Sequence, residues 1–496
     1  AKGETEKAIA DFDYALRLNP TLHQAYNNRG LAYRDMGEIE KAIADYDKAI
    51  RLKPDHADAF SNRGNAYREK GEIEKAIADL NEAIRLKPDH AGAFNNRGIA
   101  YINRGEFDKA IADFDEAIRL KSDYVEAYTN RGDAYSKKGE FDKAIADLDE
   151  AIRLKPGYVF AFNFRGNAYS EKGEIEKAIA DFDYILQLNP TFHQAYANRS
   201  DMHRLKGELD KAMADLDEVI RLKPDSAPAF NNRGLAYSEM GEIEKAMADF
   251  AEAIRLNPRL APTFVNRGLA HWGAGEYEKA VADIRQAVRL DSRNASIHLL
   301  LAAQLATCPD DDVKDVKQAI KHARTACELS DWKNPECLTM LGGTYESLAA
   351  EYAKVKQYEG QLEKAVVNYQ KAITNFDEAV RLGPDFSPAN NARAWLLATC
   401  PIAEIRNGEK AVEHATKACE LTKWKEAGCI DTLAAAYAET GDFDKAVEWI
   451  EKAIELEEDE ELLEDCKKHL ALFKEGKPDR DEPQASQPAN ESTKTN

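Results

Sequence analysis

The chain has 496 residues, of which 44% are hydrophobic and 32% are charged. Its 89 acidic and 68 basic residues leave a formal charge of −21, which argues against a nucleic-acid partner because phosphate binding needs a basic surface. No run of about eighteen apolar residues occurs, so we expect no membrane span. Seven cysteines do not form the dense framework of a small secreted protein, and we expect a reducing, cytoplasmic setting.

From Lys2 to Asn294 the sequence repeats itself every 34 residues. The period is marked by glycine, at Gly3, Gly37, Gly71, Gly105, Gly139, Gly173, Gly207, Gly241 and Gly275. A period of this length is typical of a stacked array, in which each copy buries its apolar face against the next.

One copy, Ala57 to His90, predicts two short helices. Gly71 supplies the left-handed residue that ends the first helix. Pro88 ends the second, because proline has no amide proton to continue the hydrogen-bond ladder. The apolar stripe of the second helix consists of Ile73, Ala76, Ile77, Leu80 and Ile84. Connections of two or three residues make the two helices antiparallel neighbours.

This pattern resembles the tetratricopeptide repeat. The skeleton of that family is matched by Phe60, Gly64, Tyr67, Gly71, Ala76, Leu80, Ala83 and Pro88. The resemblance implies an all-α fold, a right-handed superhelical solenoid of stacked antiparallel helix pairs. One position departs from the family pattern, because Arg63 and its equivalents occupy the place of a leucine.

The copies divide the chain into six parts. Residues 1–22 are expected to be the second helix of a truncated repeat, preceded by sequence that has been lost. The remaining parts are eight regular repeats at 23–294, an elongated variant module at 295–386, a second module at 387–460, a capping helix at 461–475 and a disordered tail at 476–496.

The two C-terminal modules resemble each other at an offset of 92 residues. Cys308, His322, Cys327, Trp332, Cys337 and Tyr345 recur as Cys400, His414, Cys419, Trp424, Cys429 and Tyr437. In the first module both helices of one pair are lengthened, by about three and two turns, which keeps their apolar faces in phase. We expect a protruding hairpin there.

An asparagine row is the first candidate site. It comprises Asn28, Asn62, Asn96, Asn130, Asn198, Asn232 and Asn266, and Phe164 interrupts it. A side-chain amide carries both a donor and an acceptor, so it can pair with a peptide unit of any sequence. The row is similar to the asparagine ladder of the O-linked N-acetylglucosamine transferase repeat domain, which implies a position on the inner face. Neighbouring candidates for peptide binding are Asn27, Asn65, Asn95, Asn163 and Asn167. The alternative is that these asparagines only cross-link adjacent helices.

The second candidate combines two series that recur together. The arginines are Arg29, Arg63, Arg97, Arg131, Arg165, Arg199, Arg233 and Arg267, and the aspartates include Asp45, Asp79, Asp113, Asp147, Asp181, Asp215 and Asp249. They form either a basic stripe for an acidic ligand or a structural ion pair in each repeat. We favour the structural interpretation because the two series recur together.

Two further sets of residues are candidate sites. The Cys and His residues of the duplicated module suggest zinc, but His322 and Cys327 lie five residues apart, on different helix faces, so core packing is favoured and no metal site is predicted. Trp332 and Trp424 are either partner anchors or residues that fill gaps between helices.

These patterns predict a non-catalytic scaffold, not an enzyme, with no cofactor. Its groove would bind an extended protein or peptide segment of neutral to basic charge. One alternative is the substrate-recognition arm of a larger enzyme whose catalytic domain is absent from this sequence. Another is a structural solenoid that self-assembles. A lost signal or membrane anchor would change the expected location.

Overall fold

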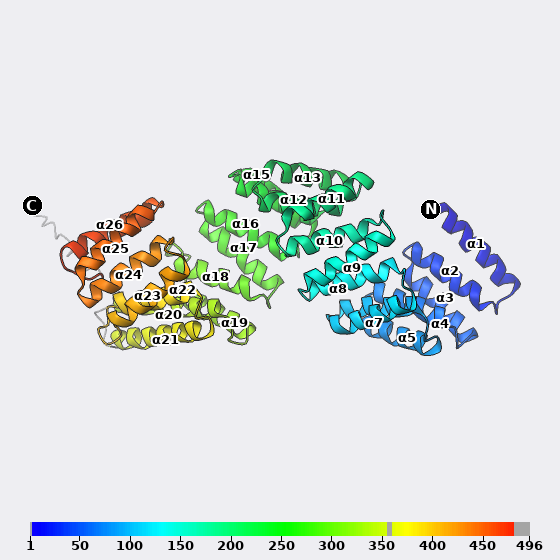
Figure 1. The fold of residues 1–496 in the computed structure, drawn as a ribbon, viewed down its shortest axis with the longest axis horizontal. Coiled ribbons are helices and arrows are strands. Elements are labelled where there is room, and N and C mark those ends of the chain that lie inside the picture. Colours follow the sequence, from blue (N-terminus) through cyan, green and yellow to red (C-terminus); the bar gives the residue numbers. More distant parts are fainter. Residues whose placement is uncertain (1, 355–359, 481–496) are drawn as a thin grey trace, which may run out of the picture. The chain divides into compact units, whose positions relative to one another are not determined.

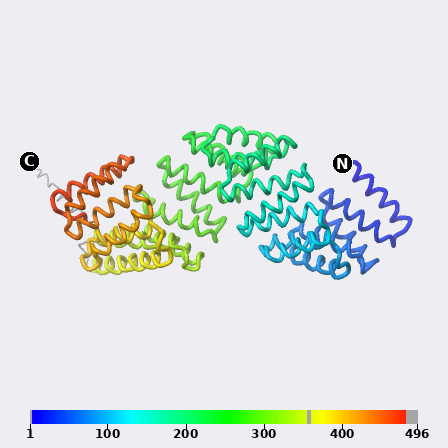
Figure 2. The backbone as a smooth tube through the Cα atoms, in the orientation of Figure 1, coloured from blue at the N-terminus to red at the C-terminus, as the bar shows by residue number. Residues whose placement is uncertain are grey.

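The computed structural model describes residues 2–354 and 360–480 (Figures 1 and 2). The described residues form helices and connecting turns, and they divide into two units, residues 1–236 and 237–496. The fold is an all-α solenoid of stacked antiparallel helix pairs, as the sequence predicts. Among the described residues, none of the helices has the length and apolar character that crossing a membrane requires.

The first unit contains α1 (Lys2–Leu18), α2 (His23–Asp35), α3 (Ile39–Leu52), α4 (Ala57–Glu69), α5 (Ile73–Leu86), α6 (Ala91–Asn103), α7 (Phe107–Leu120), α8 (Val125–Lys137), α9 (Phe141–Leu154), α10 (Val159–Glu171), α11 (Ile175–Leu188), α12 (His193–Leu205) and α13 (Leu209–Leu222). Helix α14 (Ala227–Glu239) contains the boundary between the two units.

The second unit continues with α15 (Ile243–Leu256), α16 (Ala261–Gly273), α17 (Tyr277–Leu290), α18 (Ala295–Thr307), α19 (Val316–Leu329), α20 (Pro335–Lys354), α21 (Gln361–Leu382), α22 (Ser387–Thr399), α23 (Gly408–Leu421), α24 (Ala427–Thr440), α25 (Phe443–Leu456) and α26 (Glu460–Lys474).

Two glycines with different structural roles occur in seven of the eight regular repeats, and Ser200 replaces one of them in the remaining repeat. Gly71 adopts a φ of 83° after α4, a left-handed conformation that side chains disfavour. Gly98 on α6 instead allows close helix packing, because a Cβ atom there would lie 2.6 Å from Cε1 of Phe114 on α7. The second-helix residues at the corresponding position, such as Leu80 and Phe114, are completely buried. In such a helix pair, one large side chain of the second helix therefore packs directly against a glycine of the first helix.

Helices α20 and α21 have 20 and 22 residues, whereas the regular first and second helices have 13 and 14. The predicted lengthening is confirmed, although residues 355–359, between these helices, lie outside the described residues. Tyr369 and Phe376, one heptad apart on α21, are both buried, so the inserted turns keep the apolar face in phase.

Helix α26 packs on the last regular pair through buried Cys466 and Phe473, with Leu470 partly buried beside them. Leu462, on the first turn of the same helix, is 53% exposed. The expected disordered tail falls mostly in residues 481–496, outside the described residues.

Candidate functional site: the first-helix face

In seven of the eight regular repeats the first helix carries an arginine that donates two hydrogen bonds to an aspartate of the same repeat. Arg131 donates through Nε and Nη2 to the two carboxylate oxygens of Asp147, at 2.6 Å each. The same bidentate pair joins Arg29 to Asp45, Arg63 to Asp79, Arg97 to Asp113, Arg165 to Asp181, Arg199 to Asp215 and Arg267 to Asp283. Arg233 and Asp249 occupy these positions in their repeats.

The third guanidinium nitrogen of most of these arginines reaches the preceding repeat. Nη1 of Arg131 lies 2.5 Å from Asp115, and Nη1 of Arg63 lies 2.6 Å from Asp47. The equivalent contacts join Arg29 to Asp13, Arg97 to Asn81, Arg165 to Asp149, Arg199 to Asp183 and Arg233 to Asp217. One guanidinium therefore ties two second helices to the first helix between them.

These arginines are enclosed as well as paired. The Arg63 guanidinium lies 5.4 Å from the ring centroid of Phe60 and 5.9 Å from that of Tyr67, and the side chain is 18% exposed. Burial raises the pKa of the Asp147 carboxyl, while the Arg131 hydrogen bonds lower it. The two carboxylates raise the pKa of Arg131 against the opposing effect of burial. Because the hydrogen-bond donors of these guanidinium groups already pair with carboxylates, they are not available to a ligand. We therefore treat the arginine series as structural.

The asparagine row makes a second link between repeats. Asn62 Nδ2 donates to Asn27 Oδ1 at 3.0 Å, and Asn130 Nδ2 donates to Asn95 Oδ1 at 2.9 Å. Asn198 donates to both Asn163 and Asn167, at 3.1 and 2.9 Å. Each of these three amides is half-buried and uses its N–H groups toward the preceding repeat. The row therefore cross-links neighbouring first helices, which is the alternative that the sequence left open.

The candidates beside the row do not share one role. Asn27 and Asn95 are 7% and 5% exposed and accept hydrogen bonds from the next repeat, and their contact with a peptide stays a prediction. Asn65 accepts from Arg68 at 2.6 Å. Asn28 is exposed, and Asn96, Asn232 and Asn266 are half-buried. Asn232 donates to Asp201 at 3.3 Å.

An apolar pocket of about 480 Å³ opens on first helices of the second unit. Met340 and Gly343 of α20 line it, together with Phe386 and Pro388 at the start of α22 and Thr307 at the end of α18. Sequence reasoning missed this pocket. The glycine pair Gly342–Gly343 was the available signal, because Gly342 fills the packing position while Gly343 leaves space in front of it.

Family models for repeat units match a large part of the chain. A model described as TPR repeat matches residues 1–37, 30–68, 64–103, 100–139 and 201–241. Two models described as tetratricopeptide repeat match residues 125–158 and 227–260, and residues 161–192, 261–294 and 430–460. Together the matches cover more than half of the chain. This chain belongs to the tetratricopeptide repeat family.

Solved structures of other tetratricopeptide repeat proteins resemble parts of this one. A tetratricopeptide repeat protein from Parabacteroides merdae is 23% identical, over 50% of this chain and 98% of its own, with a TM-score of 0.44. YrrB, titled a TPR protein with an unusual peptide-binding site, is 26% identical over 37% of this chain and 95% of its own, with a TM-score of 0.30. MamA is 30% identical over 32% and 94%, with a TM-score of 0.29. No curated protein matches the sequence.

The Cys and His residues of this tetratricopeptide repeat protein belong largely to its core. All seven cysteines are buried thiols, which confirms the packing interpretation. His322 Nδ1 lies 2.9 Å from His298 Nδ1, and His298 Nε2 lies 3.2 Å from the Ser292 carbonyl. Burial and the neighbouring His298 lower the pKa of His322 to about 4. The His298–His322 pair is replaced in the second module by Asn390 and His414, 3.0 Å apart.

The two duplicated tryptophans lie in left-handed turns, with φ of 58° for Trp332 and 60° for Trp424. Trp424 stacks on Trp449, with their ring centroids 4.8 Å apart, so it packs against its own module. Trp332 is 41% exposed and lines a surface pocket with Arg324 and Lys371. The two copies therefore have different surroundings in spite of their matched sequence positions.

Proposed function

We propose that this protein is a non-catalytic interaction scaffold. Its first-helix face, which is the surface that carries the asparagine row, binds an extended peptide or a disordered segment. Membership of the tetratricopeptide repeat family supports a protein or peptide partner. The charge of −21 favours a segment of neutral to basic character. We also propose a reducing compartment such as the cytoplasm, because the seven cysteines are thiols.

The fixed orientation of the row amides carries the proposal. Asn62, Asn130 and Asn198 each donate to the preceding repeat, and these bonds set the direction in which every amide group lies. Among the described residues none of the three Oδ1 atoms is seen to accept a hydrogen bond, and the side chains remain half-exposed. An acceptor that is already oriented binds a peptide N–H with little further loss of side-chain entropy. The cross-link and the binding role are therefore compatible.

The test compares binding by the full chain and by an Asn62→Ala, Asn96→Ala, Asn130→Ala variant. A phage-displayed library of random twelve-residue peptides is selected on the full chain, and the affinity of the best peptide is measured by fluorescence anisotropy. Three lost amide hydrogen bonds, at about 1 kcal/mol each, should weaken binding at least tenfold. Asn103→Ala, at an exposed position at the end of α6, is the control and should bind normally.

Circular dichroism should show the same helix content for all three proteins, because Arg63, Arg97 and Arg131 still join the repeats. If the triple variant keeps its helices and binds the selected peptide with full affinity, the row is only structural. If the library yields no peptide that competes for this face, the scaffold proposal itself fails.

A further inference from the structure

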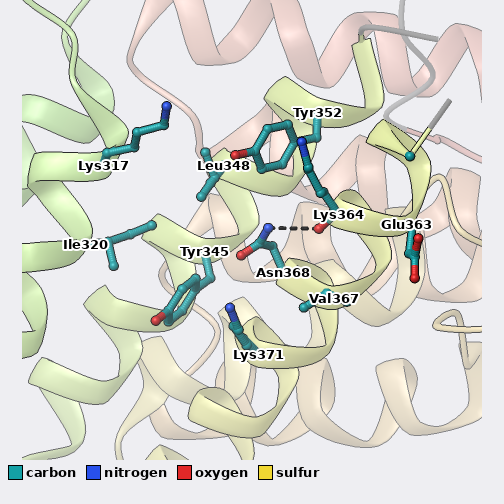
Figure 3. Close-up of a pocket in the computed structure, with 11 residues that line it drawn as sticks. Lys317, Ile320, Tyr345, Leu348, Tyr352, Glu363, Lys364, Val367, Asn368 and Lys371 are labelled. Carbon is teal, nitrogen blue, oxygen red and sulfur yellow. Dashed lines mark hydrogen bonds between the residues drawn. The ribbon is translucent and has the colours of Figure 1, made fainter. Parts of the chain in front are cut away.

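A groove of about 690 Å³ lies in the elongated module, lined by residues of α19, α20 and α21 (Figure 3). Lys317 and Ile320 come from α19, and Lys364 and Lys371 come from α21. Figure 3 shows Tyr345, Leu348 and Tyr352 of α20 between these two sides. The groove continues into a smaller pocket that Trp332 and Arg324 line together with Lys371.

The regular repeats show what such a lysine normally does. Lys75 on α5 lies 5.4 Å from the ring centroid of Tyr67 and 2.6 Å from the carboxylate of Glu72, three residues earlier. The same lysine–glutamate pair occurs at Lys41, Lys109, Lys143, Lys177, Lys211, Lys245 and Lys279. In a regular repeat this ammonium group is therefore neutralised by its own helix.

The elongated helix keeps the lysine and the tyrosine but loses the acid. Lys364 lies 5.6 Å from the ring centroid of Tyr352, and Lys371 lies 5.2 Å from that of Tyr345. Three residues before these lysines the chain has Gln361 and Asn368 in place of glutamate. Asn368 donates to the Lys364 carbonyl at 2.8 Å, so its amide is used within the helix. Both substitutions replace a carboxylate by a neutral group.

The groove thus has a local positive charge on a strongly acidic protein. Among the described residues, Lys317, Lys364 and Lys371 form no ion pair, and Glu363 is the one carboxylate in the lining. Lys364 and Lys371 are seven residues apart on one helix, a spacing of about 10 Å on the same face. At physiological salt the fields of exposed charges decay over about 8 Å, so the three lysines of the lining outweigh its one carboxylate, Glu363, and the more distant acids are screened.

We propose that this groove binds a short acidic peptide segment of a partner protein, with its carboxylates on Lys364 and Lys371 and its backbone across Tyr345 and Tyr352. A nucleic acid fits less well, because its longer run of phosphates would extend beyond the lysines onto the acidic surface. This site consists of second-helix residues and α20, so it does not depend on the asparagine row.

The probe is fluorescein-labelled octaglutamate, titrated into the full chain in 50 mM salt with anisotropy as the readout. The Lys364→Gln, Lys371→Gln variant should bind it at least tenfold more weakly. The matched control is Lys75→Gln, Lys109→Gln, which removes two lysines that already have glutamate partners and should bind normally. Gln361→Glu restores the acid of the regular repeats and should also weaken binding, without removing a lysine.

Octaglutamine and an eight-nucleotide oligothymidylate complete the set of probes. Neither should compete with octaglutamate for the groove. The proposal is overturned if octaglutamate does not bind at millimolar concentration, or if the lysine variant binds as well as the control. Tighter binding of oligothymidylate than of octaglutamate, lost in the lysine variant, would assign the groove to a polyphosphate instead. None of these results bears on the triple asparagine variant, so the two proposals fail separately.

Discussion

Replacing Arg131 by leucine should loosen the stacking of α8 on its neighbours. Arg131 holds Asp147 with two hydrogen bonds of 2.6 Å and Asp115 with one of 2.5 Å. Leucine has similar bulk and is the residue that the family pattern has at this position. The substitution therefore preserves most of the packing and removes the charge.

The two carboxylates left behind are not equally costly. The Asp147 side chain is 11% exposed, so it remains as an uncompensated buried charge, which costs about 3 to 5 kcal/mol. The Asp115 side chain is 55% exposed and can return to water, so its loss contributes about 1 kcal/mol or less. Asp115→Ala alone should therefore have a small effect. Arg131→Leu with Asp147→Leu should recover most of the loss, because no charge stays buried.

Amide hydrogen exchange of α8 and α9 is the suitable measurement, because a long repeat array need not unfold in one step. The defect should also depend on pH. Burial raises the folded-state pKa of Asp147, and removing Arg131 raises it further. A raised folded-state pKa gives stability at low pH that is lost as the pH rises, so the Arg131→Leu defect should be larger at pH 7 than at pH 4.

Three outcomes would refute this reasoning. The double variant could exchange as fast as Arg131→Leu, Asp115→Ala could be as damaging as Arg131→Leu, or the defect could be independent of pH. Any of these would mean that the arginine acts through its packed stem and not through the buried charge pair.

Two further predictions concern histidine and glycine. Because the pKa of His322 falls from 6.5 to about 4 on folding, α18 and α19 should lose on the order of 1 to 3 kcal/mol as the pH drops through this window, and their hydrogen exchange should quicken. His298→Asn, which reproduces the second module, should reduce this loss only in part, because burial is the larger cause. Gly98→Ala should cost about 1 to 3 kcal/mol in thermal denaturation, because its Cβ would contact Phe114. Gly273→Ala should add about 0.5 kcal/mol, since nothing lies near its Cβ position and its φ is ordinary; equal effects of the two substitutions would contradict the packing argument.

The helices could be predicted from sequence because their signals are local. The apolar stripe of α5, the left-handed Gly71 and the Pro88 stop lie within one repeat, and the 34-residue period carries the same assignment along the array. The lengthening of α20 and α21 followed from counting residues against that template.

Interactions between repeats were harder to derive. The sequence suggested the Arg131–Asp147 pair, but not that Nη1 of the same arginine reaches Asp115. A recurring aspartate two residues after the first one, as in Asp113 and Asp115, was the signal. The burial of Asn27 and Asn95 could not be derived either, because it depends on how closely adjacent first helices approach. The charge of the α19–α21 groove needed both the position of Lys317 and the absence of an acid at Gln361.

The second arginine contact is absent at one repeat of the second unit. Ala251 occupies the position where preceding repeats carry aspartate or asparagine, and among the described residues the carboxylate partner of Arg267 is Asp283. This junction therefore lacks the second arginine contact that Arg199 makes with Asp183 between α12 and α11, so α15 should separate from α16 at lower force than α11 separates from α12 when the array is pulled by its ends. Optical-tweezers traces would register the event as a low-force step, and Ala251→Asp would move that step to higher force.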